Sequence, residues 1–177
     1  IKADLPFKNL FSICTECNSD EKGEVDVLKA KKAIFYPFSN NHPVIEVIVD
    51  VDENALQKFI KKTSDINNKI TESEIKVDFT IKDERIESWD EIFNIKSRYF
   101  GKIADNSASW LNKVLNFYRL FKNQIEGYSI ENSFDNVITL DSDDHLGFLK
   151  SPYLKSLKAN KHLKKAVSEV SGSSKIN

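Results

Sequence analysis

The fold is indicated first by the stretch Ile75–Ile81, which reads Ile-Lys-Val-Asp-Phe-Thr-Ile. Apolar and polar residues alternate along it, and a period of two is typical of a β-strand with one buried face. Val44–Val51 reads Val-Ile-Glu-Val-Ile-Val-Asp-Val, and its β-branched residues also favour a strand. Ala33–Phe38 is a shorter apolar run closed by Pro37 and a polar turn. We expect these segments to form a small antiparallel sheet.

The second half of the chain predicts helices, because apolar residues recur every three to four positions from Ser88 onward. One helix is expected to begin at Ser88, with Glu91 at the capping-box position, and to reach Ile103. Another is expected over Trp110–Ile125, with a stop at Gly127. A short helix is also expected after Asp52. The aromatic residues at helical spacing favour a helix–helix core: Trp89, Phe93, Tyr99, Phe100, Trp110, Phe117, Tyr118 and Phe121.

The secondary structure of the C-terminal region is indicated less clearly by the sequence. Asn132–Asp141 fits either a strand or a connector, whereas Asp143–Gly147 and Pro152–Val170 predict helices with a break between them. The whole pattern predicts an α+β protein with a partial zinc-knuckle element, a small β segment and a helical C-terminal half. The expected divisions are residues 1–30, 31–84, 85–170 and a flexible tail at 171–177.

Composition excludes some classes of protein. The chain has 177 residues, with 26 Lys plus Arg against 27 Asp plus Glu, so no overall charge attracts nucleic acid. No apolar run approaches the roughly 18 residues of a membrane helix, and no signal peptide is recognisable. We therefore expect a cytoplasmic protein with no membrane partner. Because the sequence begins at Ile1 and contains no Met, we also expect that it is a fragment of a longer chain.

A nucleic-acid surface must then be a local patch, and the best candidate is a basic run near the C-terminus. We single out Lys158, Lys161 and Lys165 as phosphate contacts. A solvated helix face is the open alternative. The whole run comprises Lys150, Lys155, Lys158, Lys161, Lys164 and Lys165, with Tyr153 and His162 among them.

Two acidic patterns have structural alternatives. The cluster Asp141, Asp143, Asp144 and His145 can ligate a hard cation, but Asp ahead of a helix is more often a cap, which we favour. Glu74-x-Lys76 after the first strand is similar to the Asp…Glu-x-Lys arrangement of some nucleases. The same alternation describes any half-exposed strand, and this interpretation is favoured.

The strongest chemical motif is the pair Cys14-x-x-Cys17, the two cysteines of the chain. In a reducing compartment this spacing favours a metal site over a disulfide. Two thiolates can occupy adjacent vertices of a tetrahedral zinc site, which needs four ligands. The remaining two are not visible, because His42, His145 and His162 are scattered. Buried thiols are the alternative.

At these residues the chain resembles the second half of an HNH endonuclease motif, in the subgroup stapled by zinc. The matching residues are Asn9-Leu10, Cys14, Cys17, Asn18 and Lys22-Gly23. Two later stretches, Lys32–Phe38 and Trp89–Tyr99, look like the C-terminal extension of bacterial HNH proteins.

The resemblance implies a ββα-metal fold and metal-dependent hydrolysis of DNA. By this analogy Cys14 and Cys17 supply half of a structural zinc site, and Asn18 ligates or orients a catalytic divalent ion such as Mg²⁺. Asn9 braces the loop that holds the general base, and Lys22 contacts phosphate.

The general-base His and the first Cys pair have no match, and are expected upstream of Ile1, so the chain alone should be inert. The resemblance further implies bacterial defence against foreign DNA beside a partner ATPase. The alternative is a non-catalytic zinc-knuckle module that binds a protein or nucleic acid, and a third interpretation is a metal-free domain.

Overall fold

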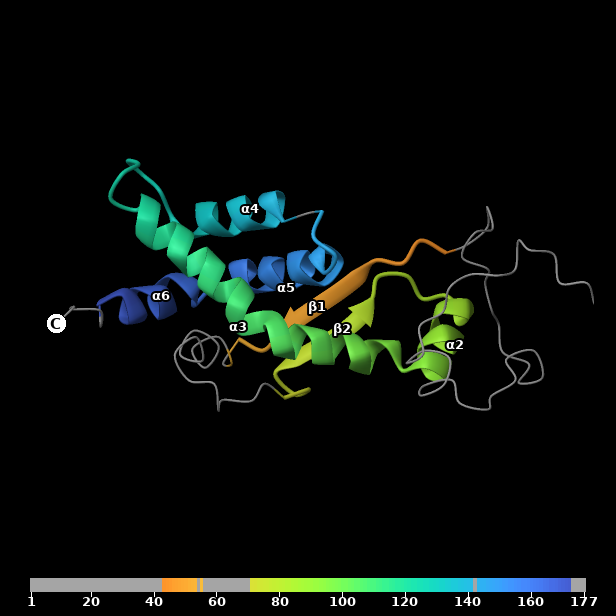
Figure 1. Cartoon of the computed structure of the whole chain (residues 1–177). Helices are drawn as coiled ribbons and strands as arrows, with labels where there is room; N and C mark the ends of the chain where they lie inside the picture. The colour runs from red at the N-terminus through yellow and green to blue at the C-terminus, as the bar shows by residue number, and fades with distance from the viewer. Residues whose placement is uncertain (1–42, 54, 56–70, 142, 173–177) are drawn as a thin grey trace, which may run out of the picture. The chain divides into compact units, whose positions relative to one another are not determined.

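The computed structural model describes residues 43–53, 55, 71–141 and 143–172. Within them it is a mostly helical mixed α/β structure with a two-stranded antiparallel sheet, which confirms the α+β expectation at this level. The elements are β1 (Val47–Val51), β2 (Ile75–Phe79), α2 (Glu84–Phe93), α3 (Ile95–Phe121), α4 (Ile130–Leu140), α5 (Gly147–Ala159) and α6 (Leu163–Gly172), as Figure 1 shows. The expected zinc-knuckle element, the strand at Ala33–Phe38 and the helix after Asp52 lie outside the described residues.

The chain divides into two compact units. A smaller unit comprises Ile1–Val44 and Lys82–Ile95, and its described part contains α2. A larger unit comprises Ile45–Ile81 and Lys96–Asn177, and it contains the sheet, α4, α5, α6 and nearly all of α3. No helix of the described residues is both long enough and apolar enough to cross a lipid bilayer.

The two strands pair as the alternation predicts. Val49 lies opposite Val77, and both are buried, whereas Asp50 and its partner Lys76 face solvent. The backbone N–H of Val51 donates to Ser156 Oγ on α5 at 3.0 Å, so α5 meets the sheet at β1. One face of the sheet therefore packs into the core, and the other is exposed.

Helix α2 does not begin at Ser88 as the sequence predicts. Its N-cap is Asp83, whose carboxylate accepts a hydrogen bond from Arg85 N at 2.8 Å, and Ser88 is buried inside the helix. Hydrogen bonds from Arg85 lower the pKa of Asp83 to about 2. Asn94, in the left-handed conformation with φ 50°, then ends the helix, because Asn tolerates this region better than most residues.

Helix α3 also differs from prediction. The helix expected from Ser88 to Ile103 is split at Asn94, and its second part continues through Trp110 as one 27-residue helix. Buried residues continue at helical spacing from Ile103 through Leu111 to Leu115, so no local signal interrupts the helix. It ends at Phe121 rather than near Gly127, which lies in the following loop with φ 73°.

The segment left open between strand and connector is helix α4. Ser129 and Asn132 form a capping box: Ser129 Oγ accepts from Asn132 N at 3.3 Å, and Asn132 Oδ1 accepts from Ser129 N at 2.8 Å. Ile130, Phe134 and Val137 are buried on one face of the helix. The spacing of three and four residues between these buried side chains therefore predicts the helix better than the strand-like composition near Leu140.

The predicted break in the last helical region lies elsewhere. Helix α5 begins at Gly147 and contains Pro152, whereas the break occurs at Asn160. Asn160 has an extended backbone, and its side chain accepts from His162 N at 2.9 Å just before α6 begins. An Asn that both ends one helix and starts the next is the local cause of the break.

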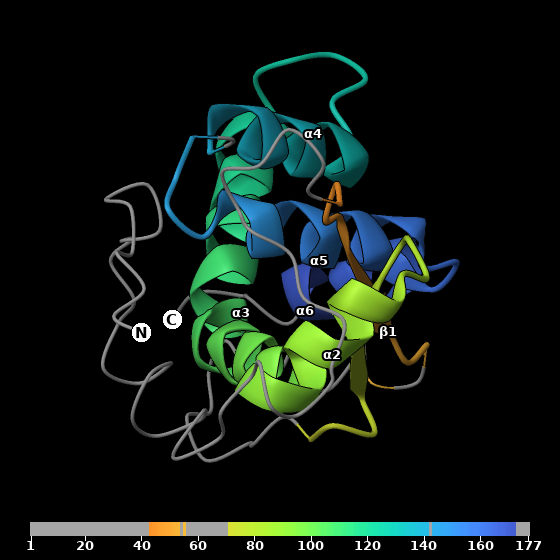
Figure 2. The same cartoon turned by 90° about the vertical axis from the view of Figure 1, so that its right-hand side faces the viewer.

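The core of the larger unit lies around α5. This helix contacts β1, α4 and α6, and Figures 1 and 2 show α3 beside it. Trp110 of α3 lies against Tyr153 of α5, with ring centroids 5.9 Å apart. The fully buried side chains of this unit include Ile75, Ile103, Leu111, Phe134, Leu149, Tyr153, Leu154 and Leu157.

Candidate functional site

The residues predicted to carry the nuclease chemistry lie outside the described part of the chain. These are Asn9, Cys14, Cys17, Asn18 and Lys22. The predicted phosphate contacts are described, and all belong to the larger unit: Lys158 lies on α5, Lys161 between α5 and α6, and Lys165 on α6.

Besides Lys150, three lysines of the basic run form ion pairs with carboxylates from other segments. The Nζ–carboxylate pairs are Lys158 with Asp135 at 2.6 Å, Lys161 with Glu53 at 2.7 Å and Lys164 with Glu131 at 3.1 Å. Their partners lie on α4 and just after β1, so the pairs join elements that are distant in sequence. The positive charge of the run is thereby largely compensated, and a phosphate must compete with these carboxylates.

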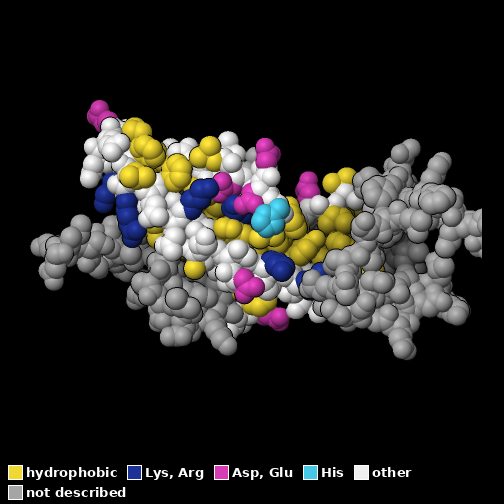
Figure 3. Space-filling model, viewed as in Figure 1, with side chains coloured by type: hydrophobic (Ala, Val, Ile, Leu, Met, Phe, Trp, Pro, Cys, Tyr) yellow, Lys and Arg dark blue, Asp and Glu magenta, His cyan; other side chains and the backbone are white. Residues whose placement is uncertain are grey.

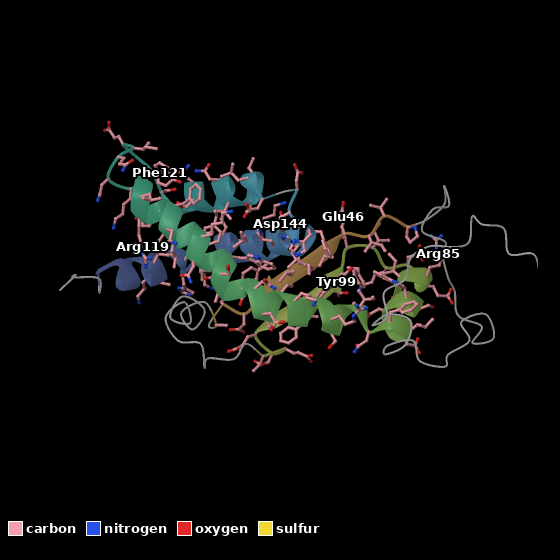
Figure 4. All side chains as sticks on the ribbon, in the orientation of Figure 1. Glu46, Arg85, Tyr99, Arg119, Phe121 and Asp144 are labelled. Atoms are coloured by element: carbon pink, nitrogen blue, oxygen red, sulfur yellow. The ribbon has the colours of Figure 1, made fainter. Side chains whose placement is uncertain are left out.

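Lys150 is the residue that departs furthest from the sequence interpretation. It is only 4% exposed, so it is not part of a phosphate-binding surface. Its Nζ lies 3.1 Å from Asp141 Oδ2 and 2.5 Å from Asp144 Oδ2, and 5.8 Å from the centre of the Trp110 ring. Figure 4 shows Asp144 at the connection between α4 and α5.

Two further side chains extend this network. Lys113 of α3 lies 2.6 Å from Asp141 Oδ1, and the exposed His145 places Nδ1 2.8 Å from Asp144 Oδ1. We call Lys113, Asp141, Asp144, His145 and Lys150 the Lys150 network. It joins the α4–α5 connection to α3.

None of the residues of this acidic cluster occupies the N-cap position of α5 as predicted, although Asp144 accepts a hydrogen bond from the Leu146 backbone just before the helix. The residue at the N-cap of α5 is Leu146, which makes no side-chain cap hydrogen bond. Asp141 instead stands at the C-terminal end of α4, and Asp141 and Asp144 act as counter-ions of the buried ammonium group. Burying a charge is costly unless it is paired, which explains why both carboxylates converge on Lys150.

The pKa values of Asp141, Asp144 and Lys150 each move toward the charged form. The hydrogen bond from Lys150 lowers the pKa of Asp144 to about 2. Burial raises the pKa of Asp141, but hydrogen bonds from Lys113 and Lys150 outweigh it and the net shift is downward. Burial similarly lowers the pKa of Lys150, and its two carboxylate partners reverse this to a net increase. Lys150 therefore stays protonated at neutral pH and is unsuited to be a base or nucleophile.

The described residues contain no metal centre of the usual kind. Across residues 43–53, 55, 71–141 and 143–172, no three His, Cys, Asp or Glu side chains are placed to hold one ion. Glu74, of the Glu-x-Lys pattern, accepts from Thr71 N at 2.8 Å and from Thr71 Oγ1 at 3.0 Å, which stabilises the turn before β2. Because the buried Lys150 is paired with Asp141 and Asp144, and Asp141 also with Lys113 of α3, we interpret the Lys150 network as a structural clamp.

Sequence reasoning missed this clamp, although one signal was present. The signal is the spacing of Asp144 and Lys150, which are six residues apart and so can approach one another across the turn before α5 and its first helical turn. The sequence does not indicate that Trp110 of α3 lies beside them. Comparison with known proteins adds no assignment, since no protein-family model, curated protein or solved structure matches the chain.

Proposed function

We propose that this chain is part of a metal-dependent endonuclease of the HNH type, which hydrolyses DNA phosphodiester bonds. The observation that carries the proposal is the spacing of Asn9-Leu10, Cys14-x-x-Cys17-Asn18 and Lys22-Gly23. Each residue type suits its place: thiolates for zinc, an amide oxygen for a hard cation and an ammonium group for phosphate.

The donor set is only half of a closed zinc site. Cys14 and Cys17 supply two ligands of the four that such a site requires. The first histidine of the sequence, His42, follows the motif, so we assign no general base within it. A divalent ion would supply charge stabilisation at the phosphate. Asn18 would hold or orient that ion, Asn9 would brace the adjacent loop, and Lys22 would bind a neighbouring phosphate.

The larger unit supports this function as a scaffold. Because Lys158 and Lys161 are paired with carboxylates, we propose that the main DNA contact is at Lys22 and that Lys158, Lys161 and Lys165 have a secondary part. On the same resemblance we propose a cytoplasmic role in bacterial defence against foreign DNA, beside a partner ATPase.

The test is cleavage of supercoiled plasmid DNA by the native full-length protein, with Mg²⁺ or Mn²⁺ added. We expect cleavage that Asn18→Ala reduces by about 100-fold or more, because an ion ligand contributes several kcal/mol to the transition state. Asn123→Ala, at an exposed loop position, is the matched control and should cleave normally. Cleavage by Asn18→Ala at the wild-type rate, or none by the wild type with either ion, would overturn the proposal.

The alternative is a non-catalytic zinc-knuckle module that binds a protein or nucleic acid. The observation that favours it is the ion pairing of Lys158 and Lys161, which leaves the helical half poorly suited to grip DNA. A zinc-loaded protein that cleaves no DNA would select this function over the nuclease.

A further inference from the structure

One edge of the sheet is closed by a helix, and the other is the outer edge of β2. At the outer edge of β1, the backbone N–H of Val51 donates to Ser156 Oγ on α5 at 3.0 Å. Figure 1 shows β2 beside β1, and β1 is the only strand hydrogen-bonded to β2 in the described part of the chain. A strand edge without a neighbour can pair with another strand. The outer edge of β2 is therefore the position at which this sheet can be extended.

Val77 directs its backbone groups to this outer edge. The hydrogen bonds between the two strands include Thr80 N to Glu46 O and Asp52 N to Glu74 O, both at 3.0 Å. Along an antiparallel pair, consecutive residues point their backbone groups toward the partner strand and away from it in turn. Val77 lies three positions from both Thr80 and Glu74, so its N–H and C=O point away from β1. Among the described residues, no hydrogen bond from Val77 N is present.

The neighbouring outward N–H groups of β2 have local partners. Ile75 N donates to Thr71 O at 3.3 Å, and Phe79 N donates to Asp78 Oδ1 at 2.9 Å. Val77 is therefore the residue about which a second strand can exchange a pair of backbone hydrogen bonds.

The side chains of β2 are complementary to those of a second, antiparallel β2 strand. From Ile75 to Phe79 they are in turn apolar, positive, apolar, negative and apolar. When two copies pair about Val77, Lys76 of each copy lies opposite Asp78 of the other. Ile75 likewise lies opposite Phe79. The ion pairs then lie on the outward face of the sheet, and the apolar pairs lie on its buried face.

Charge also selects this register over its neighbours. Moving the two-fold centre by one residue toward the N-terminus puts Lys76 opposite Lys76 of the second copy. Moving it by one residue toward the C-terminus puts Asp78 opposite Asp78. Like charges directly opposite one another destabilise a strand pair. Of these three registers, only the one centred on Val77 pairs opposite charges.

The surroundings of the two charged residues permit this pairing. Lys76 is exposed, and within its own sheet it lies opposite Asp50. Asp78 already contacts Lys96, whose Nζ lies 3.1 Å from Asp78 Oδ1, but a carboxylate can accept from several donors. In the paired sheet, Lys76 therefore lies between Asp50 of its own copy and Asp78 of the other.

A second copy suits this edge better than a nucleic acid does. The edge carries Lys76 and Asp78, so it has no excess of positive charge for a phosphate backbone. At the centre of the face drawn in Figure 3, acidic and basic side chains also lie next to one another. A strand of the same sequence, by contrast, supplies the opposite charge at both positions.

We propose that two copies of this chain associate through β2, forming a four-stranded antiparallel sheet in the order β1-β2-β2-β1. The Val77 N–H of each copy donates to the Val77 carbonyl of the other, and two ion pairs between Lys76 and Asp78 flank this centre. Because α5 packs along β1, the outer edge of β1 accepts no further copy, and the assembly closes as a dimer with two-fold symmetry. The proposal does not depend on nuclease activity.

The first measurement is sedimentation velocity of the full chain from about 5 to about 300 µM, because two paired strands of this length bury too little area for a tight dimer. We expect a dimer that dissociates on dilution. Lys76→Asp puts carboxylates opposite one another at both positions, and should weaken dimerisation by about tenfold or more. Lys155→Asp, at an exposed position of α5, is the matched control and should change it less than about twofold.

A charge reversal separates pairing from simple loss of a lysine. Lys76→Asp/Asp78→Lys exchanges the two charges, so opposite charges again face one another between the copies. We expect this chain to dimerise within about threefold of the wild type. Circular dichroism and urea unfolding establish whether it folds, since Asp78 also contacts Lys96.

A disulfide measurement reports the register without depending on charge. Opposed residues of a non-hydrogen-bonded pair have Cα atoms about 4.5 Å apart, which a disulfide can span. The chains Lys76→Cys and Asp78→Cys are mixed and oxidised, and mass spectrometry identifies the linked peptides. We expect a disulfide between the two introduced cysteines in the mixture, and none between introduced cysteines when either chain is oxidised alone.

Several results would overturn the proposal. A wild-type chain that stays monomeric at about 300 µM is one, and a dimer that Lys76→Asp leaves unchanged is another. A folded charge-reversed chain that dimerises no better than Lys76→Asp would also contradict it. If the charge-reversed chain does not fold, the disulfide result decides: no linkage in the mixture, or linkage in the Lys76→Cys chain alone, excludes pairing centred on Val77.

Discussion

Replacing Lys150 by Met tests the Lys150 network most sharply. The substitution keeps an unbranched side chain of similar length but removes the ammonium group that two carboxylates share. Removing one partner of a buried ion pair typically costs about 3–5 kcal/mol, because the other partner is left uncompensated. The structure reduces that figure in two ways. Asp141 keeps Lys113 at 2.6 Å, and the Asp144 side chain, which is 35% exposed, can be hydrated.

We therefore expect Lys150→Met to lower the free energy of unfolding by about 2–3 kcal/mol. With a urea dependence of about 2–3 kcal/mol per molar, the midpoint should fall by roughly 1 M. The assay is urea unfolding followed by Trp110 fluorescence in a Trp89→Phe background, so that only the larger unit reports. The Trp89→Phe chain without further change is the reference.

Lys158→Met is the matched control, since it removes one exposed ion pair with Asp135. It should cost about 0–1 kcal/mol, because exposed pairs contribute little. A Lys150→Met chain as stable as the Lys158→Met chain would refute the conclusion that Lys150 clamps the α4–α5 connection to α3.

Three other changes follow from the same structure. The carboxyl of Asp144 has a pKa of about 2 against 3.8 unperturbed, so the stability that it contributes above pH 4 should be lost as the pH falls toward 2. In thermal melts over this range, the melting temperature of Asp144→Asn should fall less than that of the wild type. Leu111→Ala, at a fully buried position of α3, should cost about 2–5 kcal/mol in urea unfolding, while the exposed Leu120→Ala stays within about 0.5 kcal/mol; equal costs would contradict the assigned burial. Gly127→Ala should cost about 1 kcal/mol by the same assay, because φ is 73° although space for a Cβ is open, and a gain in stability would exclude this conformation.

The sheet was predictable because its signal is local. Alternation along Ile75–Ile81 and Val44–Val51 identifies both strands and their buried faces, whereas the register within the pair is seen only in the structure. The alternation predicts the C-terminal end of the second strand less well. Ile81 continues the apolar pattern, but it lies beyond the end of β2 and is 43% exposed.

Helix boundaries were harder, because several residues offered similar caps. Asp83 and Ser88 can both begin a helix, and only the carboxylate contact with Arg85 N distinguishes them. The break at Asn94 depends on a left-handed backbone that Asn permits but does not require.

The charged residues were least predictable. A lysine in a basic run gives no sequence signal for burial, and Lys150 is buried because Asp141, Asp144 and Trp110 meet it from separate elements. The ion pairs of Lys158 and Lys161 at the surface were also not predictable, because their carboxylate partners are distant in sequence. The residues of the proposed nuclease motif, by contrast, can be assessed only from the sequence, because they lie outside the described part of the chain.

The most direct test of the proposed function is elemental analysis of zinc in the native full-length protein and in its Cys14→Ser/Cys17→Ser variant. We expect about one zinc per chain in the native protein, as a closed four-ligand site requires, and its loss from the variant. A native protein without zinc, or a variant that retains it, would contradict the zinc-stapled site on which the endonuclease proposal rests.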